Sequence, residues 1–271
     1  MAESVVSAIR HKFVLGVKRF VYGKRGEPYV IAGRTLRYTP GTRPVRTRYA
    51  NSPNDNSRYD ALQVQLLAEH LREGDTAIDI GAHYGQYCIL MAEMCGAMGD
   101  VVAFEPDPHA RRMLMRNLRL NPTIKPPTVE LLAVSDAQGE AVLYSRGGNS
   151  QSSLARSAIG QAEGGGVESM VVPLVTLDAY VRDKGLRQPR LIKIDTEGAE
   201  IRILKGAPKL LASNAKIACE LHPYAWEELG NSFAELKVLV SNSGRRMRYL
   251  DQHTEIGSDV KYGSVLLERI E

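Results

Sequence analysis

Four ionisable side chains stand close together late in the sequence, each at the end of an apolar run typical of a buried strand. Asp195 and Glu197 follow one such run, and Glu220 and His222 end the next. Because the carboxyl ends of parallel strands meet at one edge of a sheet, we expect these side chains to converge. An imidazole, with an ordinary pKa near 6.5, suits removal of a hydroxyl proton, and carboxylates can orient that hydroxyl. The group predicts a catalytic site with His222 as general base.

Each of these residues also has a structural interpretation. His222 could be a buried histidine of the core, and Glu197 and Glu200 could stabilise the start of a helix, where acidic residues are favoured. Asp195 with Glu220 could hold a divalent metal, but the two have no recognisable ligand spacing. We therefore predict no metal ligand, and a divalent metal stays an alternative.

A second candidate segment is the glycine turn after the apolar run 76–80. Gly81 and Gly85 let backbone approach a ligand closely, and the helix expected after them offers free N–H groups. The spacing is D-x-G-x-x-x-G, whereas a dinucleotide-binding turn has G-x-G-x-x-G. The carboxylate of Asp79 would repel a pyrophosphate but attract the ammonium group of an amino acid. A strand that turns into a helix without binding a ligand is the alternative.

Glu105 ends the next strand-like run, 26 residues after Asp79. An acidic side chain at this place commonly accepts hydrogen bonds from the ribose hydroxyls of a nucleoside. The alternative is an exposed glutamate beside the turn at Pro106. Together with the glycine turn, Glu105 predicts an adenosine-type ligand whose tail is an amino acid rather than a phosphate.

These segments resemble those of the FkbM-type methyltransferases. The turn 79–85 is similar to that family's D-[IV]-G-A-N-x-G, with His83 in place of the usual Asn, and Phe104-Glu105-Pro106 resembles its strand-two signature. More specific is a series of motifs that occurs here in the family's order. It comprises Thr176-Leu177-Asp178, Lys193-Ile194-Asp195-Thr196-Glu197-Gly198-Ala199-Glu200, Lys205-Gly206-Ala207 and Glu220-Leu221-His222. The resemblance covers about Glu73 to His222.

The resemblance implies a methyltransferase that uses S-adenosylmethionine, releases S-adenosylhomocysteine and methylates an oxygen. Such enzymes commonly act on sugars, glycolipids or polyketide-derived metabolites, so the expected acceptor is a hydroxyl of a small molecule such as a glycan, glycolipid or secondary metabolite. The expected catalytic residues are Asp195, Glu220, His222 and Glu197. The expected cofactor-binding residues are Asp79, Gly81, Ala82, His83, Tyr84, Gly85, Glu105, Pro106, Ala133, Val134 and Asp195.

The order of elements predicts an α/β fold of the Rossmann-like class I methyltransferase type, with a mostly parallel sheet and helices on both faces. Strands are expected at 76–80, 101–104, 129–134, 191–194, 216–221, 247–250 and 264–269. Helices are expected at 57–71, 84–95, 108–120, 199–211 and 226–242. Strands at 141–144 and 170–175 flank a polar loop, 145–166, and predict an inserted β-hairpin. Its segment Asn149–Leu154 is a candidate lid or a surface excursion.

The N-terminal part of the sequence is basic. Residues 1–50 carry eleven Lys or Arg against Glu3 and Glu27, whereas the rest carries 24 basic and 29 acidic residues. An amphipathic helix is expected over Ser4–Tyr22, and short strands near 29–32 and 35–38. We therefore divide the chain into a basic N-terminal arm, 1–56, and a methyltransferase domain, 57–271. The positive charge of the arm predicts that it can associate peripherally with a membrane. The alternative is that the arm forms a solvated basic face beside an acidic body.

Three other functions remain as alternatives. A nicotinamide-dependent dehydrogenase or epimerase is disfavoured by the glycine spacing. A nucleic-acid-binding protein or nucleic-acid methyltransferase would use the basic arm. However, no Asn-Pro-Pro-Tyr-like tetrapeptide follows the fourth main strand and aromatic residues are sparse in the arm, so we expect no nucleic-acid partner. The third alternative is a cofactor-binding scaffold without catalysis.

Three cysteines, Cys88, Cys95 and Cys219, lie in apolar stretches without paired metal spacing, which indicates reduced, buried thiols. No apolar run approaches the roughly 20 residues that span a bilayer, and basic residues interrupt any signal-type segment near the N-terminus. The expected location is therefore the cytoplasm. The sequence makes no prediction of oligomeric state.

Overall fold

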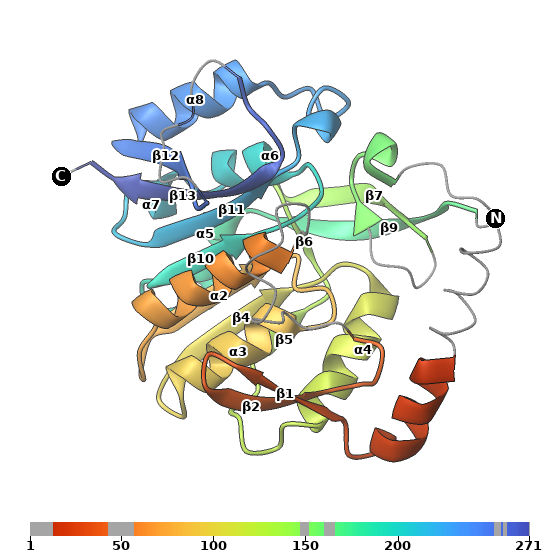
Figure 1. Ribbon diagram of the computed structural model, residues 1–271. Coiled ribbons are helices and arrows are strands. Elements are labelled where there is room, and N and C mark those ends of the chain that lie inside the picture. The colour runs from red at the N-terminus through yellow and green to blue at the C-terminus, as the bar shows by residue number, and fades with distance from the viewer. Residues whose placement is uncertain are drawn as a thin grey trace.

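The computed structural model describes residues 13–42, 57–146, 152–159, 166–251, 256 and 259–270. Its centre is a seven-stranded sheet in the order β12-β13-β11-β10-β3-β4-β5 (Figure 1). These strands are, in that order, Arg245–Tyr249, Gly263–Arg269, Lys216–Leu221, Leu191–Ile194, Thr76–Ile80, Asp100–Phe104 and Thr128–Glu130. The strands from β11 to β5 are parallel, and β13 and β12 add antiparallel pairs at one edge. The predicted Rossmann-like α/β fold class is confirmed.

Helices cover both faces of this sheet and enclose two hydrophobic clusters. One face packs against α2 (Ser57–His70), α3 (Gln86–Cys95) and α4 (Pro108–Arg119). The other packs against α5 (Leu177–Asp183), α6 (Glu200–Lys205), α7 (Pro208–Leu211) and α8 (Phe233–Asn242). Successive residues of a strand point to opposite faces, so β3 gives Ala77 to the first cluster and Ile78 and Ile80 to the second.

Three ionisable residues take places on the face covered by α2 and α3. Asp79 of β3 and Lys193 of β10 are partners in register. Glu220 lies two residues after Ala218, which is the β11 partner of Lys193. Because side chains alternate with a period of two, all three point to the same face. They lie beside the point where the strand order reverses between β10 and β3, which is where open α/β sheets bind ligands.

A smaller sheet in the order β6-β9-β7-β8 stands beside the main one. Its strands are Ala133–Val134, Glu168–Val175, Gly139–Ser145 and Ser152–Ser153, and a 3-10 helix, η2, spans Arg156–Ile159. The antiparallel pairing of β7 with β9 confirms the predicted inserted hairpin. Of the candidate lid, 149–151 lies outside the described residues, and β8 pairs with β7.

Several predicted boundaries were wrong for identifiable reasons. The run 129–134 is two strands, because the chain leaves the main sheet after Glu130 and Ala133 pairs with β9 instead. The predicted helix 199–211 is divided into α6 and α7, since Pro208 lacks an N–H and starts a new helix. The predicted helix 226–242 begins only at Phe233; η3 (Pro223–Ala225) and a turn precede it. Helix α5 was not predicted.

The N-terminal unit comprises a helix over residues 13–22 and a hairpin of β1 (Glu27–Ile31) and β2 (Arg34–Tyr38). Ile31, Leu36 and Tyr38 belong to the same hydrophobic cluster as α3, so the hairpin packs on the face of the main sheet that α3 covers. The first part of the helix expected over Ser4–Tyr22 lies outside the described residues. Within the described ranges, no helix is both long and apolar enough to cross a bilayer.

Candidate active site

The glycine turn between β3 and α3 is shaped by a close backbone contact. Gly81 has a φ of +82°, and a Cβ there would lie 1.8 Å from the carbonyl oxygen of Asp195. Any other residue would therefore push β10 away from β3. Gly85 has a φ of +85° and directly precedes α3. The first turn of that helix thus begins beside the ends of both central strands.

His83 lies within this turn on left-handed backbone, with a φ of +48°. Its backbone N–H donates to Oε2 of Glu105 over 2.6 Å, and its ring stacks on Tyr84 at a centroid distance of 3.6 Å. Burial lowers the pKa of His83 to about 4, so the ring is neutral at physiological pH. Asn and His both tolerate left-handed backbone better than most residues, which explains how His83 replaces an asparagine here.

Glu105 is buried at the end of β4. Its carboxylate accepts the backbone N–H of His83 through Oε2 and that of Asp107 through Oε1, the latter over 2.9 Å. Burial raises the pKa of Glu105 to about 8, and these two hydrogen bonds act in the opposite direction. Glu105 is therefore not the exposed turn residue of the alternative interpretation. It holds the glycine turn through these hydrogen bonds, and it lines a cavity at the carboxyl ends of β3, β4 and β10.

Lys193 was not among the residues selected from the sequence, yet it connects the two central carboxylates. Its Nζ lies 3.1 Å from Oδ2 of Asp195 and 3.8 Å from Oδ1 of Asp79, and 4.5 Å from the ring centroid of Tyr87. Burial alone would lower the pKa of Lys193, but the negative charges of Asp195 and Asp79 raise the pKa by more than burial lowers it. The side chain is therefore a cation. A lysine inside an otherwise apolar strand, L-I-K-I, was the available signal.

Asp79 is fully enclosed, and neither of its oxygens accepts a well-formed hydrogen bond among the described residues. Burial raises its pKa to about 6, although the charge of Lys193 acts against this shift. Asp79 does not line the cavity. The cation nearest to Asp79 is Lys193. Because Asp79 lies outside the cavity lining, its negative charge balances that of Lys193 rather than that of a ligand.

His222 is held from one side by a buried carboxylate. Its Nδ1 lies 2.8 Å from Oε1 of Glu200, whose other oxygen accepts the indole N–H of Trp226 over 2.7 Å. Its Nε2 faces two further carboxylates, 3.6 Å from Oε2 of Glu197 and 3.9 Å from Oδ1 of Asp195. The imidazole is thus fixed in orientation, with one ring nitrogen directed toward carboxylates that line the cavity.

The charges around His222 determine its protonation. Burial would lower its pKa, but the hydrogen bond to Glu200 and the charges of Glu200, Asp195 and Glu197 raise it to about 9. At neutral pH the ring is therefore an imidazolium before any acceptor binds. Its basicity is well above that of a free imidazole, which strengthens it as a base once it is neutral.

Glu220 belongs to the same cluster but faces a different side. It accepts hydrogen bonds from the Tyr262 hydroxyl and, over 3.3 Å, from Nε2 of Gln63. Burial, followed by the charge of Asp195, raises its pKa to about 7. One donor atom each from Asp195, Glu220 and His222 lies within 4.8 Å of the others, a spacing that could hold a metal ion. Lys193 already supplies a cation at this place.

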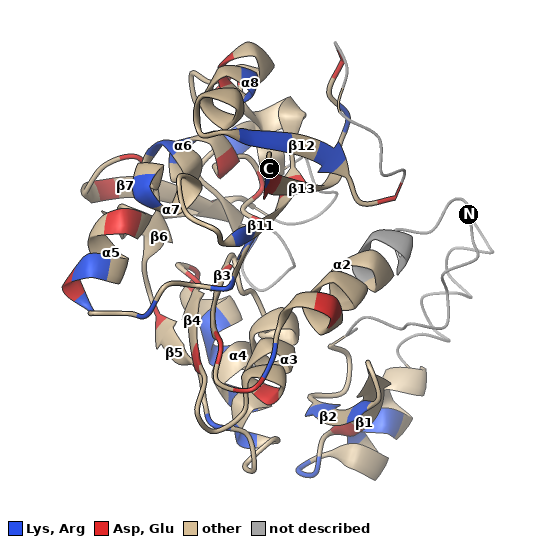
Figure 2. Cartoon of the chain, turned by 90° about the vertical axis from the view of Figure 1, so that its left-hand side faces the viewer, with Lys and Arg blue, Asp and Glu red and all other residues tan. Residues whose placement is uncertain are grey.

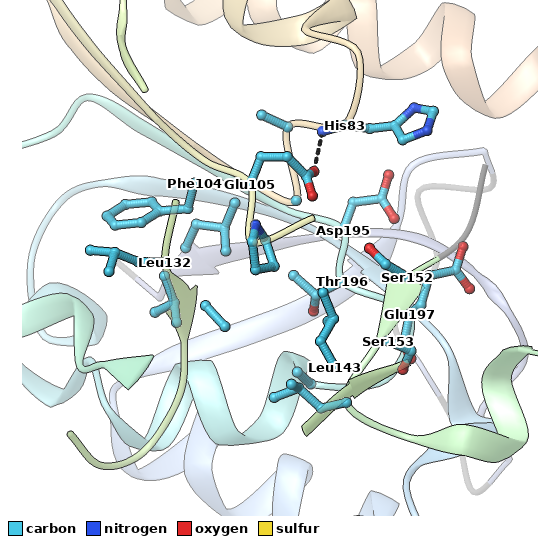
Figure 3. Close-up of a pocket in the computed structure, with 18 of the residues that line it drawn as sticks. His83, Phe104, Glu105, Leu132, Leu143, Ser152, Ser153, Asp195, Thr196 and Glu197 are labelled. Carbon is cyan, nitrogen blue, oxygen red and sulfur yellow. Dashed lines mark hydrogen bonds between the residues drawn. The ribbon is translucent and has the colours of Figure 1, made fainter. Parts of the chain in front are cut away.

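The cavity beside these residues runs along the carboxyl ends of β3, β4 and β10. Figure 3 shows Phe104 and Leu132 at one end and Asp195 and Glu197 at the other, with Glu105 hydrogen-bonded to His83 between them. The cavity is lined by eight of the predicted cofactor-binding residues: Gly81, Ala82, His83, Glu105, Pro106, Ala133, Val134 and Asp195. Tyr84 and Gly85, like Asp79, lie outside this lining.

The predicted catalytic residues divide into two groups. Asp195 and Glu197 line the cavity, whereas Glu220 and His222 do not. Only 2% of His222 is exposed, and the two cavity carboxylates separate it from the open space. Glu197 has left-handed backbone with a φ of +54° and accepts the Tyr224 hydroxyl over 2.8 Å.

Comparison with known proteins gives the family. The profile of the methyltransferase FkbM domain matches residues 79–249, more than half of the chain. The chain belongs to the FkbM family of methyltransferases. The family inferred from the sequence motifs is therefore confirmed, and so is S-adenosylmethionine as the cofactor of this family.

One curated relative is the hexuronic acid methyltransferase AglP of Haloferax volcanii, which is 28% identical over 161 residues. The match covers 59% of this chain and 61% of that protein, less than two thirds of its length. Among solved structures, an S-adenosylmethionine-dependent methyltransferase from Aquifex aeolicus aligns over 83% of this chain and 99% of its own, with 16% identity and a TM-score of 0.40. An rRNA methylase from Streptococcus thermophilus aligns over 79% and 98%, with 14% identity and a TM-score of 0.45.

The FkbM cavity has the polarity that S-adenosylmethionine requires. Its apolar end, at Phe104 and Leu132, suits an adenine ring, and its acidic end suits the positive charges of the sulfonium and the ammonium group. Besides Lys193, sequence reasoning missed the partnership of Glu200 with His222 and the contact of Tyr262 with Glu220. Glu200 was interpreted as a helix-end residue, and it does accept the Gly198 N–H over 2.8 Å. The same carboxylate oxygen also contacts His222.

Proposed function

We propose that this FkbM-family protein transfers the methyl group of S-adenosylmethionine to a hydroxyl oxygen of a small sugar-type acceptor. The observation that carries the proposal is the Glu200–His222 pair, whose Nε2 faces the two carboxylates of the cavity wall. An alcohol needs a base before it can act as a nucleophile, and this pair is suited to that task. The hexuronic acid methyltransferase relative supports a sugar acceptor.

Bound S-adenosylmethionine would supply a methyl group activated by its sulfonium: attack of an acceptor oxygen on the methyl carbon, opposite the sulfur, would release S-adenosylhomocysteine. In this proposal Glu105 accepts the ribose hydroxyls while the apolar end of the cavity encloses the adenine. Asp195 lies at the opposite end and attracts the ammonium group. The role first expected of Asp79 thus passes to Asp195, because Asp79 is enclosed and does not line the cavity, whereas Asp195 does.

His222 acts as the general base in this scheme. Neutral His222 takes the hydroxyl proton at Nε2, and Glu200 stabilises the resulting imidazolium through Nδ1–H, as the carboxylate does in other histidine-based sites. The acceptor must pass Glu197 to reach Nε2, so the side chain of Glu197 moves aside when the acceptor binds. Asp195 and Glu220 then hold the acceptor in place by accepting hydrogen bonds from its hydroxyl groups.

A product analysis tests the proposal. The purified protein is incubated with S-adenosylmethionine labelled in the methyl group and with soluble glycosides of hexuronic acids and of neutral hexoses. We expect a labelled methyl ether, which survives mild alkali. A label that mild alkali removes would be a carboxylate ester, which needs no general base, and would contradict hydroxyl methylation. Absence of transfer to every glycoside, with transfer to another small hydroxyl compound, would contradict the sugar acceptor alone.

A further inference from the structure

The helix over residues 13–22, here called the N-terminal helix, presents an apolar surface to solvent. Phe13 is 72% exposed and Phe20 is 92% exposed, and Val14, Val17 and Val21 are exposed as well. At 3.6 residues per turn, these five side chains fall within an arc of about 120° on the helix. A helix of a globular protein normally buries such an arc against its core. This helix does the opposite.

The other side of the helix explains this orientation, because it is anchored to the protein. Leu15, Lys18 and Tyr22 are partly buried. Lys18 forms an ion pair with Glu27 of β1, and a Cβ at Gly41 would contact the Leu15 side chain at 3.0 Å. These contacts fix the rotation of the helix, so its apolar arc points away from the domain. Figure 1 shows the helix at the rim of the molecule, beside the β1–β2 hairpin.

Positive charge borders the apolar arc. Between residues 13 and 42 the chain carries six Lys or Arg and one acidic residue, Glu27, which is paired with Lys18. Arg19, Lys24 and Arg25 are exposed at the flank and the end of the helix. Figure 2 shows basic residues around β1 and β2. The surface therefore combines bulky apolar side chains with three cations, Arg19, Lys24 and Arg25, that form no ion pair within the described ranges.

We propose that the N-terminal helix docks on an anionic lipid bilayer, with Phe13 and Phe20 in the headgroup boundary and the flanking cations on lipid phosphates. An amphipathic helix of this composition lies in the membrane interface and gains from both contributions. A second copy of this chain is a poorer occupant, because a symmetric contact would bring the same cations face to face. The inference goes beyond the proposed function and does not depend on which hydroxyl is methylated.

Vesicle cosedimentation of the full chain tests this proposal. The vesicles contain either phosphatidylcholine alone or an equimolar mixture with phosphatidylglycerol. We expect binding to the anionic vesicles that weakens as salt is raised, and much weaker binding to phosphatidylcholine. The double variant Phe13→Ser, Phe20→Ser should lower the partition coefficient by roughly tenfold or more. The double variant Arg19→Gln, Lys24→Gln should lower it on anionic vesicles only.

A matched control replaces two exposed apolar residues elsewhere, Val171→Ser with Val238→Ser, and should bind like the wild type. Equal binding by the Phe13→Ser, Phe20→Ser variant would overturn the proposal. A dimer of the wild type that is absent in this variant would also overturn the proposal, because the apolar arc would then contact a second copy of the chain. So would a lower melting temperature of the variant, because the arc would then be covered by another part of its own chain.

Discussion

The two walls of the cavity are held by different kinds of contact. At the β3–α3 wall the backbone dominates: Gly81 lies against the carbonyl of Asp195, and the His83 N–H donates to Glu105. At the acidic wall, formed by Asp195 and Glu197 after β10, ionised side chains dominate. Behind this wall, at the end of β11, His222 contacts Glu200. The first wall depends on the shape of one turn, and the second depends on a balance of charges between strands. Substitutions should therefore separate cofactor binding from proton transfer.

The largest effect is expected at His222. Loss of a general base typically costs 10²–10⁴-fold in rate, so His222→Ala should lower turnover by at least about a hundredfold. Affinity for S-adenosylhomocysteine, measured by calorimetry, should hardly change, because His222 does not line the cavity. His70→Ala, outside the site, serves as the control. Near-normal turnover of a folded His222→Ala variant would assign the base to a carboxylate.

Removing the central cation should mainly destabilise the fold. Lys193→Met leaves the enclosed Asp79 without its cation, and breaking a buried pair costs about 3–5 kcal/mol. Lys125→Met breaks a half-exposed pair with Asp100 and should cost about 1 kcal/mol or less. Urea denaturation of the two variants gives the comparison. Equal losses would mean that Lys193 does not balance the buried charge.

The pH dependence of kcat/KM distinguishes the two candidate bases, His222 and Glu220. His222 must be neutral to accept a proton, and its pKa is raised to about 9. The value of kcat/KM should therefore rise with pH, by about fiftyfold between pH 7 and 9, and level off above pH 10 at about a hundred times its value at pH 7. Glu200→Gln removes the adjacent negative charge and should move this rise to lower pH. A profile that levels off near the Glu220 pKa of about 7 would favour Glu220 as the base.

A smaller effect is expected on the backbone wall. Glu105→Ala should weaken S-adenosylhomocysteine binding by roughly 1–3 kcal/mol, because it removes the proposed acceptor of the ribose hydroxyls and the hydrogen bond that holds the His83 N–H in the glycine turn. Turnover at saturating cofactor should change less than affinity. Glu130→Ala, at the end of the neighbouring strand β5 but outside the cavity lining, is the matched control. Calorimetry that finds equal affinities for both variants would remove Glu105 from the cofactor site.

The smallest effect is expected from metal removal. Lys193 places a cation against Asp195, which reduces the attraction of the Asp195, Glu220 and His222 group for a second one. Turnover should therefore be unchanged after dialysis against a chelator. Loss of activity that magnesium or manganese restores would show that these three residues bind a metal, and the acidic wall would then rely on an added ion.

Much of the backbone architecture was predictable because it is local. The apolar runs fixed strands β3, β10 and β11 almost to the residue, and the glycine spacing identified the turn that Gly81 and Gly85 form. The motif series around Asp195 gave the family. Prediction failed where the partner of a segment decides its structure, as at Ala133, whose apolar run continues from one sheet into another.

The sequence by itself determined the fold class, the glycine turn and the set of ionisable residues at the strand ends. Only the tertiary structure decided which of them are partners. His222 meets Glu200, 22 residues away, and Lys193 meets Asp79 because β10 and β3 pair in one particular register. That register places their side chains on the same face of the sheet, and no local pattern specifies it. Sequence alone names the charged groups, but strand pairing sets their separations and hence their protonation.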